Sequence, residues 1–185
     1  MTLKNSRIAI LVAQQYQEME IWYPLYRLRE TGAQVVTLGA AAGQSYPSKL
    51  GYPCKADMSW EEAKAADFDG IVAPGGFAPD FIRRHVAPIQ LVKDFHQQGK
   101  LVAAICHGPW VLCSADVLRG KRATSFFAIK DDVVNAGALW EDSEVVRDGN
   151  IVTSRKPDDL PAFVLACIDV LAGRAWLILR CFLYV

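Results

Sequence analysis

The chain has 185 residues, which is long enough for one domain with a sizeable hydrophobic core. Hydrophobic residues make up 52% and charged residues 22%, and 20 Lys and Arg balance 20 Asp and Glu, so that the formal net charge is +0. This balance excludes a long-range attraction to nucleic acid or to an anionic membrane, and it does not oppose self-association into an oligomer.

The cysteine pattern bears on compartment and on metal binding. The sequence contains five cysteines, an odd number, and no CxxC pair. This pattern predicts neither a disulfide framework nor a zinc site. The first residues also lack the apolar stretch and the small-residue cleavage site of a signal peptide, so we expect a cytoplasmic protein.

Apolar runs and helical periodicities alternate along the chain. Residues 7–13 are almost continuously apolar, which predicts a strand buried on both faces of a sheet. Further strands are predicted at 34–38, 69–73 and 101–105, and a hairpin at 144–146 and 151–153. Helices are predicted at 18–31, 60–64 (capped by Ser59), 88–98, 109–118, 130–136 and 157–171. The Gly- and Pro-containing stretch 40–57 predicts a loop or an irregular hairpin.

The alternation of buried strands and helices favours an α/β fold with a mostly parallel sheet covered on both faces. No linker, repeat or low-complexity stretch divides residues 1–174, which we interpret as a single domain. Residues 175–185 form an apolar C-terminal tail that is shorter than the roughly 20 residues needed to span a bilayer. An extra strand, a continued helix and an interface patch all remain open for this tail.

Ligands of parallel α/β sheets bind beyond the carboxyl ends of the strands. Cys106 directly follows the strand predicted at 101–105, and His107 and Gly108 come next, before a helix. A nucleophile on such a tight turn, a nucleophile elbow, projects into the crevice beside the N–H groups of the helix N-terminus. These groups favour the thiolate form of a cysteine. The alternative is a small buried cysteine that only packs, but the strand end with His and Gly beside it favours chemistry.

Two further segments lie at neighbouring strand ends. Gly75 and Gly76 follow the strand predicted at 69–73, and paired glycines let main-chain N–H groups approach a substrate and hold an oxyanion. Glu18 is explained by the helix dipole alone. Glu20 shares a helical stripe with apolar residues, so that it either points inward toward Cys106, where it could move a proton, or stays at the surface.

These segments resemble the PfpI family of the PfpI/ThiJ superfamily. The nucleophile motif is 104–109 (AICHGP), and the glycine segment is 73–80 (APGGFAPD). The first helix resembles the family through Glu18-Met-Glu20 and Tyr23-Pro24. The pattern is completed by segments 118–120, 124–125, 129–132, 135–137 and 153–155.

The resemblance implies a flavodoxin-like three-layer sandwich and a set of site residues. Cys106 would be the nucleophile, Glu20 its buried carboxyl partner and His107 the adjacent catalytic histidine. Gly75 and Gly76 would supply the oxyanion N–H groups, with the His107 N–H nearby. In oligomers of this family an acidic residue of a neighbouring subunit completes a Cys-His-acid triad, and the matching residue is Asp80.

Two site positions depart from the family pattern, and the tail after Gly173 is not part of it. The family usually has Glu at position 80, and the shorter Asp80 side chain reaches about 1.5 Å less far. Relatives often have Tyr at position 126, where this chain has Phe126 and therefore no hydroxyl.

The resemblance implies two enzymatic functions, and a third hypothesis of another class stands beside them. The first is a cofactor-free deglycase or glyoxalase that acts on methylglyoxal-derived carbonyl adducts of proteins or peptides and protects against carbonyl stress. The alternatives are an intracellular cysteine peptidase, and a redox-sensing or chaperone-like stress protein in which Cys106 is oxidised to a sulfinate. For all three we expect a homo-oligomer, a dimer or a hexamer, with no metal, no nucleic-acid-binding patch and no membrane span.

Overall fold

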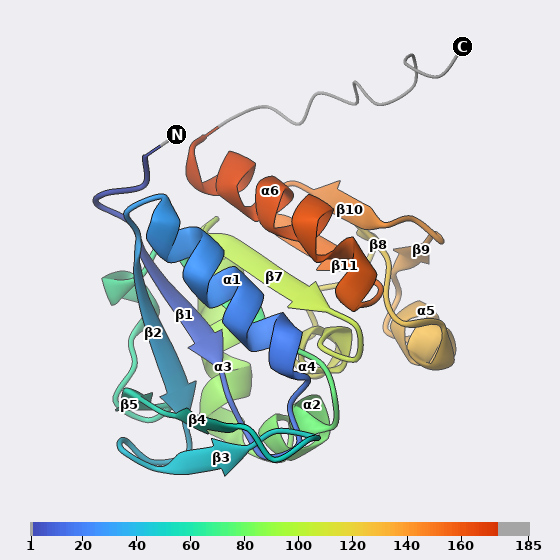
Figure 1. Cartoon of the computed structure of the whole chain (residues 1–185). Helices are drawn as coiled ribbons and strands as arrows, with labels where there is room; N and C mark the ends of the chain where they lie inside the picture. The colour runs from blue at the N-terminus through green and yellow to red at the C-terminus, as the bar shows by residue number, and fades with distance from the viewer. Residues whose placement is uncertain (1, 174–185) are drawn as a thin grey trace.

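The computed structural model describes residues 2–173 and contains a seven-stranded central sheet (Figure 1). Its strand order is β10-β11-β7-β6-β1-β2-β5, and every neighbouring pair is parallel except β10 and β11. The strands are β1 (Arg7–Leu11), β2 (Gln34–Gly39), β5 (Met58–Ser59), β6 (Gly70–Ala73), β7 (Leu101–Ile105), β10 (Val145–Asp148) and β11 (Ile151–Ser154).

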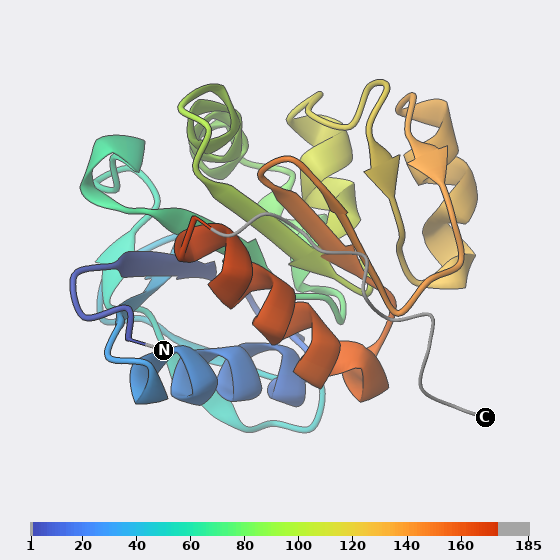
Figure 2. The same ribbon diagram turned by 90° about the horizontal axis from the view of Figure 1, so that it is seen from above.

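Helices cover both faces of this sheet. Figure 2 shows α1 and α6 on one face and α3 and α4 on the other. The helices are α1 (Glu18–Glu30), α2 (Ala78–Ile82), α3 (Val86–Gln97), α4 (Pro109–Ser114), α5 (Lys130–Asn135) and α6 (Leu160–Leu171). The fold is therefore the three-layer α/β sandwich with a mostly parallel sheet that the sequence predicts.

The buried strands explain why the sheet forms the centre. All residues of β6 and β7 are buried, and so are four of the five residues of β1. Strands covered on both faces are apolar throughout, which is the pattern of these segments. Helix α1 buries Ile21, Leu25 and Leu28 at helical spacing and leaves its opposite face to solvent.

Two small sheets lie outside the central one. Strands β3 (Ser45–Pro47) and β4 (Pro53–Lys55) form an antiparallel hairpin, as predicted for the stretch 40–57. Strands β8 (Arg122–Ala123) and β9 (Leu139–Trp140) form a parallel pair that was not predicted. Its two-residue strands are too short to carry a periodic signal.

One predicted helix is wrong and another is too long. Residues 60–64 form turns because the Trp60 main chain and indole both donate hydrogen bonds, to Gly39 O and Leu38 O, which hold this residue against the sheet edge. Helix α4 ends at Ser114, four residues early, and Asp116 takes a left-handed φ of 53°. Helix α2 was not predicted.

No helix in the described part of the chain is long and apolar enough to cross a membrane. The tail at 175–185, for which the sequence leaves an extra strand, a continued helix and an interface patch open, lies outside the described residues. The single domain at 1–174 stays a prediction.

Candidate active site

Cys106 lies on a strained turn between β7 and α4. Its φ is 62°, a left-handed conformation that is rare for a residue with a side chain and that is concentrated at functional sites. Its N–H donates a 3.0 Å hydrogen bond to Ser154 O at the end of β11. The turn is thus held by the neighbouring strand, and Cys106 as a whole is 8% exposed.

The sequence around Cys106 permits this turn because Gly108 has no side chain. A Cβ at this position would overlap Ala73 O and come within 2.8 Å of Ile105 O. The Gly108 N–H also donates a 2.7 Å hydrogen bond to Ile105 O, which closes the turn. Any larger residue would push the start of α4 away from the ends of β6 and β7.

Glu20 projects from the first turn of α1 into the interior. It is 0% exposed, so the inward orientation left open by the sequence is the one found. Its Oε2 accepts a 2.6 Å hydrogen bond from the N–H of Gly75. Its Oε1 is buried without a hydrogen-bond partner of ordinary geometry, and its carboxyl interacts with the Cys106 side chain.

The protonation of Glu20 and Cys106 is coupled. Burial raises the pKa of the Glu20 carboxyl to about 8, so this group carries a proton at neutral pH. Burial also raises the pKa of the Cys106 thiol to about 12, and the Glu20 charge adds to this rise. The N–H groups of Gly76 and His107 lower the thiol pKa. The thiol pKa is thus raised, whereas a helix N-terminus alone would lower it, because the effect of burial is larger than that of the helix dipole.

A protonated Glu20 changes this balance in favour of the thiolate. The carboxyl then carries no charge to repel the sulfur anion, and a proton on Oε1 would have the sulfur as its neighbouring acceptor. The pair can therefore hold one proton on the carboxyl while the sulfur acts as nucleophile.

His107 supplies a second proton-transfer group. Its Nδ1 lies 3.3 Å from Cys106 Sγ. Burial lowers the pKa of His107, and the charge of Lys49 acts in the same direction, so the ring is neutral at pH 7 and can accept a proton. The ring is stacked on Phe126 at 5.0 Å and meets Trp110 edge-on at 5.2 Å, which fixes its orientation.

The N–H groups of the two glycines after β6 have different partners. The Gly75 N–H is occupied by Glu20 and positions that carboxyl. The Gly76 N–H, like that of His107, interacts with the Cys106 sulfur. A Cβ on Gly75 would lie 2.7 Å from both Cys106 Cβ and Glu20 Oε2, so only glycine fits between nucleophile and carboxyl.

Asp80 does not join this group within the chain. It lies in α2 with a half-buried side chain and forms an ion pair with Arg84 one turn later. No hydrogen bond connects it with His107 in the described residues. Its predicted role across a subunit interface stays a prediction.

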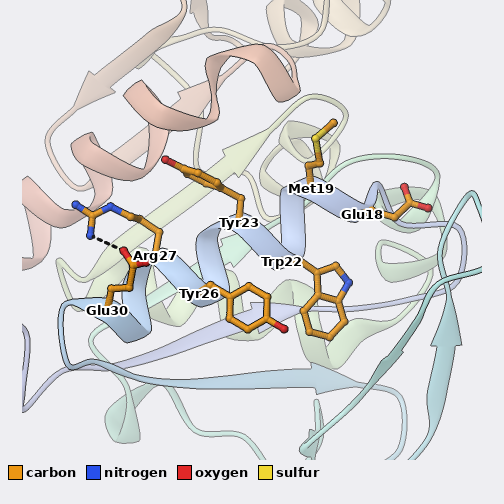
Figure 3. Close-up of a pocket in the computed structure, with 7 residues that line it drawn as sticks. All are labelled: Glu18, Met19, Trp22, Tyr23, Tyr26, Arg27 and Glu30. Atoms are coloured by element: carbon orange, nitrogen blue, oxygen red, sulfur yellow. Dashed lines mark ion pairs between the residues drawn. The ribbon is translucent and has the colours of Figure 1, made fainter.

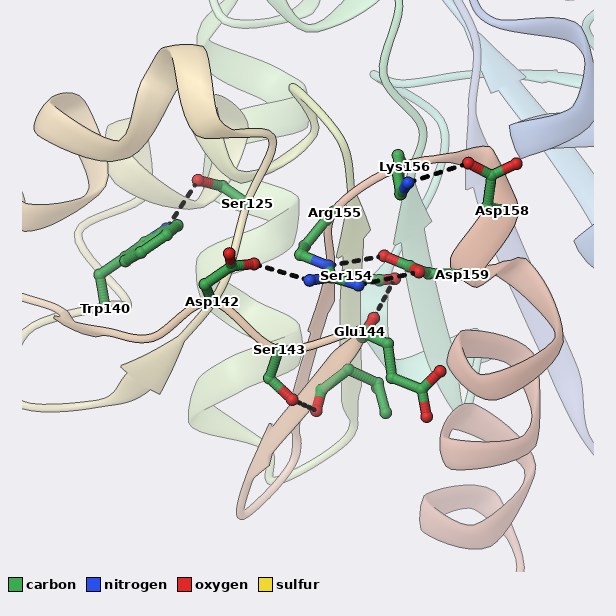
Figure 4. Close-up of polar contacts among 11 residues, drawn as sticks. Ser125, Trp140, Asp142, Ser143, Glu144, Ser154, Arg155, Lys156, Asp158 and Asp159 are labelled. Carbon is green, nitrogen blue, oxygen red and sulfur yellow. Dashed lines mark hydrogen bonds and ion pairs between the residues drawn. The ribbon is translucent and has the colours of Figure 1, made fainter.

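A polar network supports the strand end that holds Cys106 (Figure 4). Ser154 accepts the Cys106 N–H with its main-chain oxygen, and its hydroxyl donates a 2.7 Å hydrogen bond to Glu144 O. Arg155 donates hydrogen bonds to Asp159 at 2.9 Å and to Asp142 at 2.7 Å. These contacts fix the connection between β11 and α6 against the loop that precedes β10.

The sequence did not reveal Lys49 as a neighbour of the site. Its charge acts on Glu20 and on His107, although it lies in the stretch 40–57, which had no predicted chemistry. No periodic or motif signal marks such a residue, because a loop brings it to the site. No three His, Cys, Asp or Glu side chains gather into a group that could hold a metal ion anywhere in residues 2–173.

A left-handed cysteine after a buried strand, with a carboxyl and a histidine beside it, defines an α/β protein with a nucleophile-elbow thiol. Residues 6–170 match the family model described as the DJ-1/PfpI family. The chain belongs to this family.

The matches to named relatives cover almost the whole chain. A deglycase of Pyrococcus abyssi is 44% identical over 165 residues, which cover 89% of this chain and 99% of the relative. The protein/nucleic acid deglycase 2 of Escherichia coli is 42% identical over 161 residues, covering 86% of this chain and 94% of the relative. A Bacillus subtilis relative, 41% identical over 167 residues, covering 90% and 99%, is provisionally named a cysteine protease.

Solved structures agree with the fold. The chain resembles a two-domain protein of Anabaena variabilis, with DJ-1/ThiJ/PfpI-like and ferritin-like domains, at a TM-score of 0.90 and 41% identity. The match covers 96% of this chain and 52% of that one. DJ-1beta of Drosophila melanogaster matches at a TM-score of 0.84 and 30% identity, covering 94% of this chain and 92% of that one. The fold is the flavodoxin-like sandwich of this superfamily.

Proposed function

We propose that this protein is a cysteine-dependent, cofactor-free deglycase or glyoxalase-type hydrolase that acts on methylglyoxal-derived carbonyl adducts. The observation that carries the proposal is the group formed by the buried Cys106 and Glu20 side chains and the partly buried His107, where α1 meets the ends of β6 and β7. The thiol can add to a carbonyl carbon. Glu20, whose pKa is raised, can donate a proton, and His107, whose pKa is lowered, can accept one, so the group suits a reaction with both addition and proton-transfer steps. The names of the deglycase relatives support the same reaction class.

The chemistry starts with addition of the Cys106 sulfur to the aldehyde-derived carbon. With a free 2-oxoaldehyde, the carbonyl oxygen takes up a proton and a hemithioacetal forms; with an aminocarbinol adduct, the amine leaves with a proton instead. The proton on the reacting carbon then moves, through an enediol, to the neighbouring carbonyl carbon, and the hydroxyl proton moves to the oxygen of that carbonyl, which gives the thioester of a 2-hydroxy acid. Water hydrolyses the thioester, releases a 2-hydroxy acid and restores the thiol.

His107 and Glu20 divide the proton transfers in this proposal. Neutral His107, 3.3 Å from the sulfur, is placed to accept the thiol proton. Protonated Glu20 is placed to donate to a developing oxygen anion or to the sulfur. The N–H groups of Gly76 and His107 face the same position and would stabilise negative charge there.

The test measures methylglyoxal loss and lactate formation without added glutathione. The wild type and Cys106→Ala are compared, with Cys113→Ala as the matched control, because Cys113 is a half-buried thiol on α4 outside the group. Turnover that requires Cys106 and not Cys113 supports the proposal. Absence of lactate formation by the wild type would refute it.

The cysteine peptidase is the second candidate, supported by the name of the Bacillus subtilis relative. It requires Asp80 of one subunit to approach His107 of another, and its test is cleavage of unfolded casein. Asp80→Asn should abolish cleavage if the triad forms, and it should leave lactate formation unchanged if the enzyme is a deglycase.

We also propose that the protein assembles from copies of itself, as a dimer or hexamer, in the cytoplasm. Figure 3 shows a shallow apolar hollow on the outer face of α1, lined in part by Met19, Tyr23 and Tyr26. Met19 is 53% and Tyr26 54% exposed, and such neighbouring apolar side chains can pack against a second copy of the chain. Light scattering of the wild type and of Tyr26→Glu tests the assembly, and a monomeric wild type would contradict it.

A further inference from the structure

The loop that carries Lys49 is fixed against the candidate active site. The Lys49 N–H donates a 2.9 Å hydrogen bond to Tyr16 O, and Tyr16 in turn pairs with Ser48 on one side and Gly76 on the other. Three segments therefore lie side by side, and one of them contains the N–H group that faces the Cys106 sulfur.

Side chains of α1 hold the same loop at both ends of Lys49. Glu18 accepts a hydrogen bond from the Ser48 hydroxyl and a 2.8 Å bond from the Leu50 N–H. Trp22 meets the Tyr52 ring edge-on at 5.4 Å. Figure 3 shows Glu18 and Trp22 on the helix that also carries Glu20. The position of Lys49 is thus fixed relative to the buried carboxyl.

Lys49 has no ion-pair partner among the described residues. Its charge acts on Glu18, but that carboxylate is engaged by the loop itself. Burial is the largest influence on the pKa of Glu20 and on that of His107, and the charge of Lys49 lowers both pKa values. A protonated Glu20 does not neutralise the ammonium group, so an exposed cation without an ion-pair partner remains on the loop that lies beside the Tyr16 and Gly76 segments.

We propose that Lys49 is a specificity-determining residue that binds the carboxylate of 2-hydroxy acids next to Cys106. The inference rests on the proposed function, in which a neutral carbonyl substrate is converted into a hydroxy acid. The negative charge arises first on the enediol oxygens and then on the product carboxylate. Lys49 lies on the loop that pairs, through Tyr16, with the segment of Gly76, and its ammonium group is a positive charge that can bind either anion.

The experiment uses alkylation of Cys106, which does not depend on turnover. Rates with iodoacetate, an anion, and iodoacetamide, its neutral counterpart, are measured for the Cys106 peptide by mass spectrometry. The ratio of the two rates cancels changes in thiolate content. Lys49→Met should lower this ratio about threefold to tenfold, as expected for one charge acting through partly solvated surroundings. Lys49→Arg should preserve it.

The matched control is Lys55→Met, because Lys55 is an exposed lysine of the same hairpin and its charge acts on neither Glu20 nor His107. The wild-type ratio should also fall with added salt, and the Lys49→Met ratio should not. An unchanged ratio in Lys49→Met, or an equal fall in Lys55→Met, would overturn the proposal.

A second measurement tests the ligand class. Lactate should protect wild-type Cys106 from iodoacetamide, lactamide should not, and the protection should be lost in Lys49→Met. Protection by lactamide to the same extent would overturn the carboxylate assignment. A charge effect of Lys49 without methylglyoxal turnover would refute the proposed function and leave the anion site in place, so the two failures are distinguishable.

Discussion

The N–H of Gly75 donates a 2.6 Å hydrogen bond to Oε2 of Glu20, although 55 positions separate the two residues. The bond joins the end of β6 to the first turn of α1 and places a buried carboxyl next to the Cys106 turn. Because a protein interior disfavours an unpaired carboxylate, the same burial that fixes Glu20 also keeps it protonated. Position and protonation state therefore have one physical origin.

The first prediction concerns Gly75. In Gly75→Ala the new Cβ would lie 2.7 Å from Cys106 Cβ and from Glu20 Oε2 and 2.9 Å from His107 N. None of these atoms is the end of a flexible side chain free to move, so we expect at least about a hundredfold loss of turnover.

Gly99→Ala is the control for this change. Gly99 has a positive φ of 67°, which Gly75 does not have, but a Cβ there meets no atom within 4 Å. It should cost about 1 kcal/mol of stability and leave turnover unchanged. Wild-type-like turnover in Gly75→Ala would show that the close approach at this glycine is not needed.

The second prediction concerns the pH dependence of stability. Folding raises the pKa of Glu20 from an ordinary 4.5 to about 8, so the folded state binds a proton that the unfolded state has lost. The contribution of this group is fully present below pH 4.5 and is lost as the pH rises to 8. Over this range the wild type should lose up to about 1.4 kcal/mol per pH unit relative to Glu20→Gln.

Urea unfolding at several pH values between 5 and 8 measures this difference. Glu20→Gln keeps an oxygen that can accept the Gly75 N–H but removes the titration. Parallel stability curves for the two proteins would mean that Glu20 is ionised in the folded state at neutral pH.

The site shows what the sequence could and could not predict. The elbow at Cys106 was predictable, because a strand end followed by His and Gly has a local signature. The burial of Glu20 was left as one of two alternatives, because one helical turn does not fix which face meets the sheet. The use of the Gly75 N–H was not predictable, since it depends on the distance between two distant segments.

The fold was predicted well where segments were long and apolar. The buried strands β1, β6 and β7 have continuous apolar runs, helix α1 has apolar residues at helical spacing, and helix α6 is a long apolar segment between Pro157 and Gly173. The turn at 60–64 was predicted as a helix because its local sequence allows one. Tertiary contacts of Trp60 with Leu38 and Gly39 decide against it, and no local pattern contains them.

The third prediction concerns His107. Its pKa is lowered by burial, so the neutral imidazole persists to a lower pH than in an exposed histidine, whose ordinary pKa is 6.5. If neutral His107 accepts the thiol proton, kcat/KM for methylglyoxal should stay level from pH 7, where Glu20 is protonated, down to pH 6.5 and should fall below it. His107→Gln should lose about a hundredfold in kcat and no longer show this acid limb.

The pH profile of kcat/KM, measured from pH 5 to 8, separates this role from a structural one. Loss of packing against Phe126 would lower the rate at every pH without changing the shape of the profile. An acid limb that survives in His107→Gln belongs to a different group and would contradict the assignment.

The last prediction concerns the support of the nucleophile turn by Arg155. This side chain binds Asp159, whose carboxylate is only 7% exposed, and also Asp142. Arg155→Met leaves the Asp159 carboxylate buried without its cation, which should cost about 3 kcal/mol of unfolding free energy. The exposed pair of Lys156 with Asp158 provides the control, and Lys156→Met should cost less than about 1 kcal/mol.

Because Ser154 O accepts the Cys106 N–H, the loss of Arg155 should also slow iodoacetamide alkylation of Cys106 or broaden it into several rates. Equal stabilities of the two variants in urea would show that the Arg155 network does not hold this strand end, and the strain at Cys106 would then have to be maintained by β7 and α4 alone.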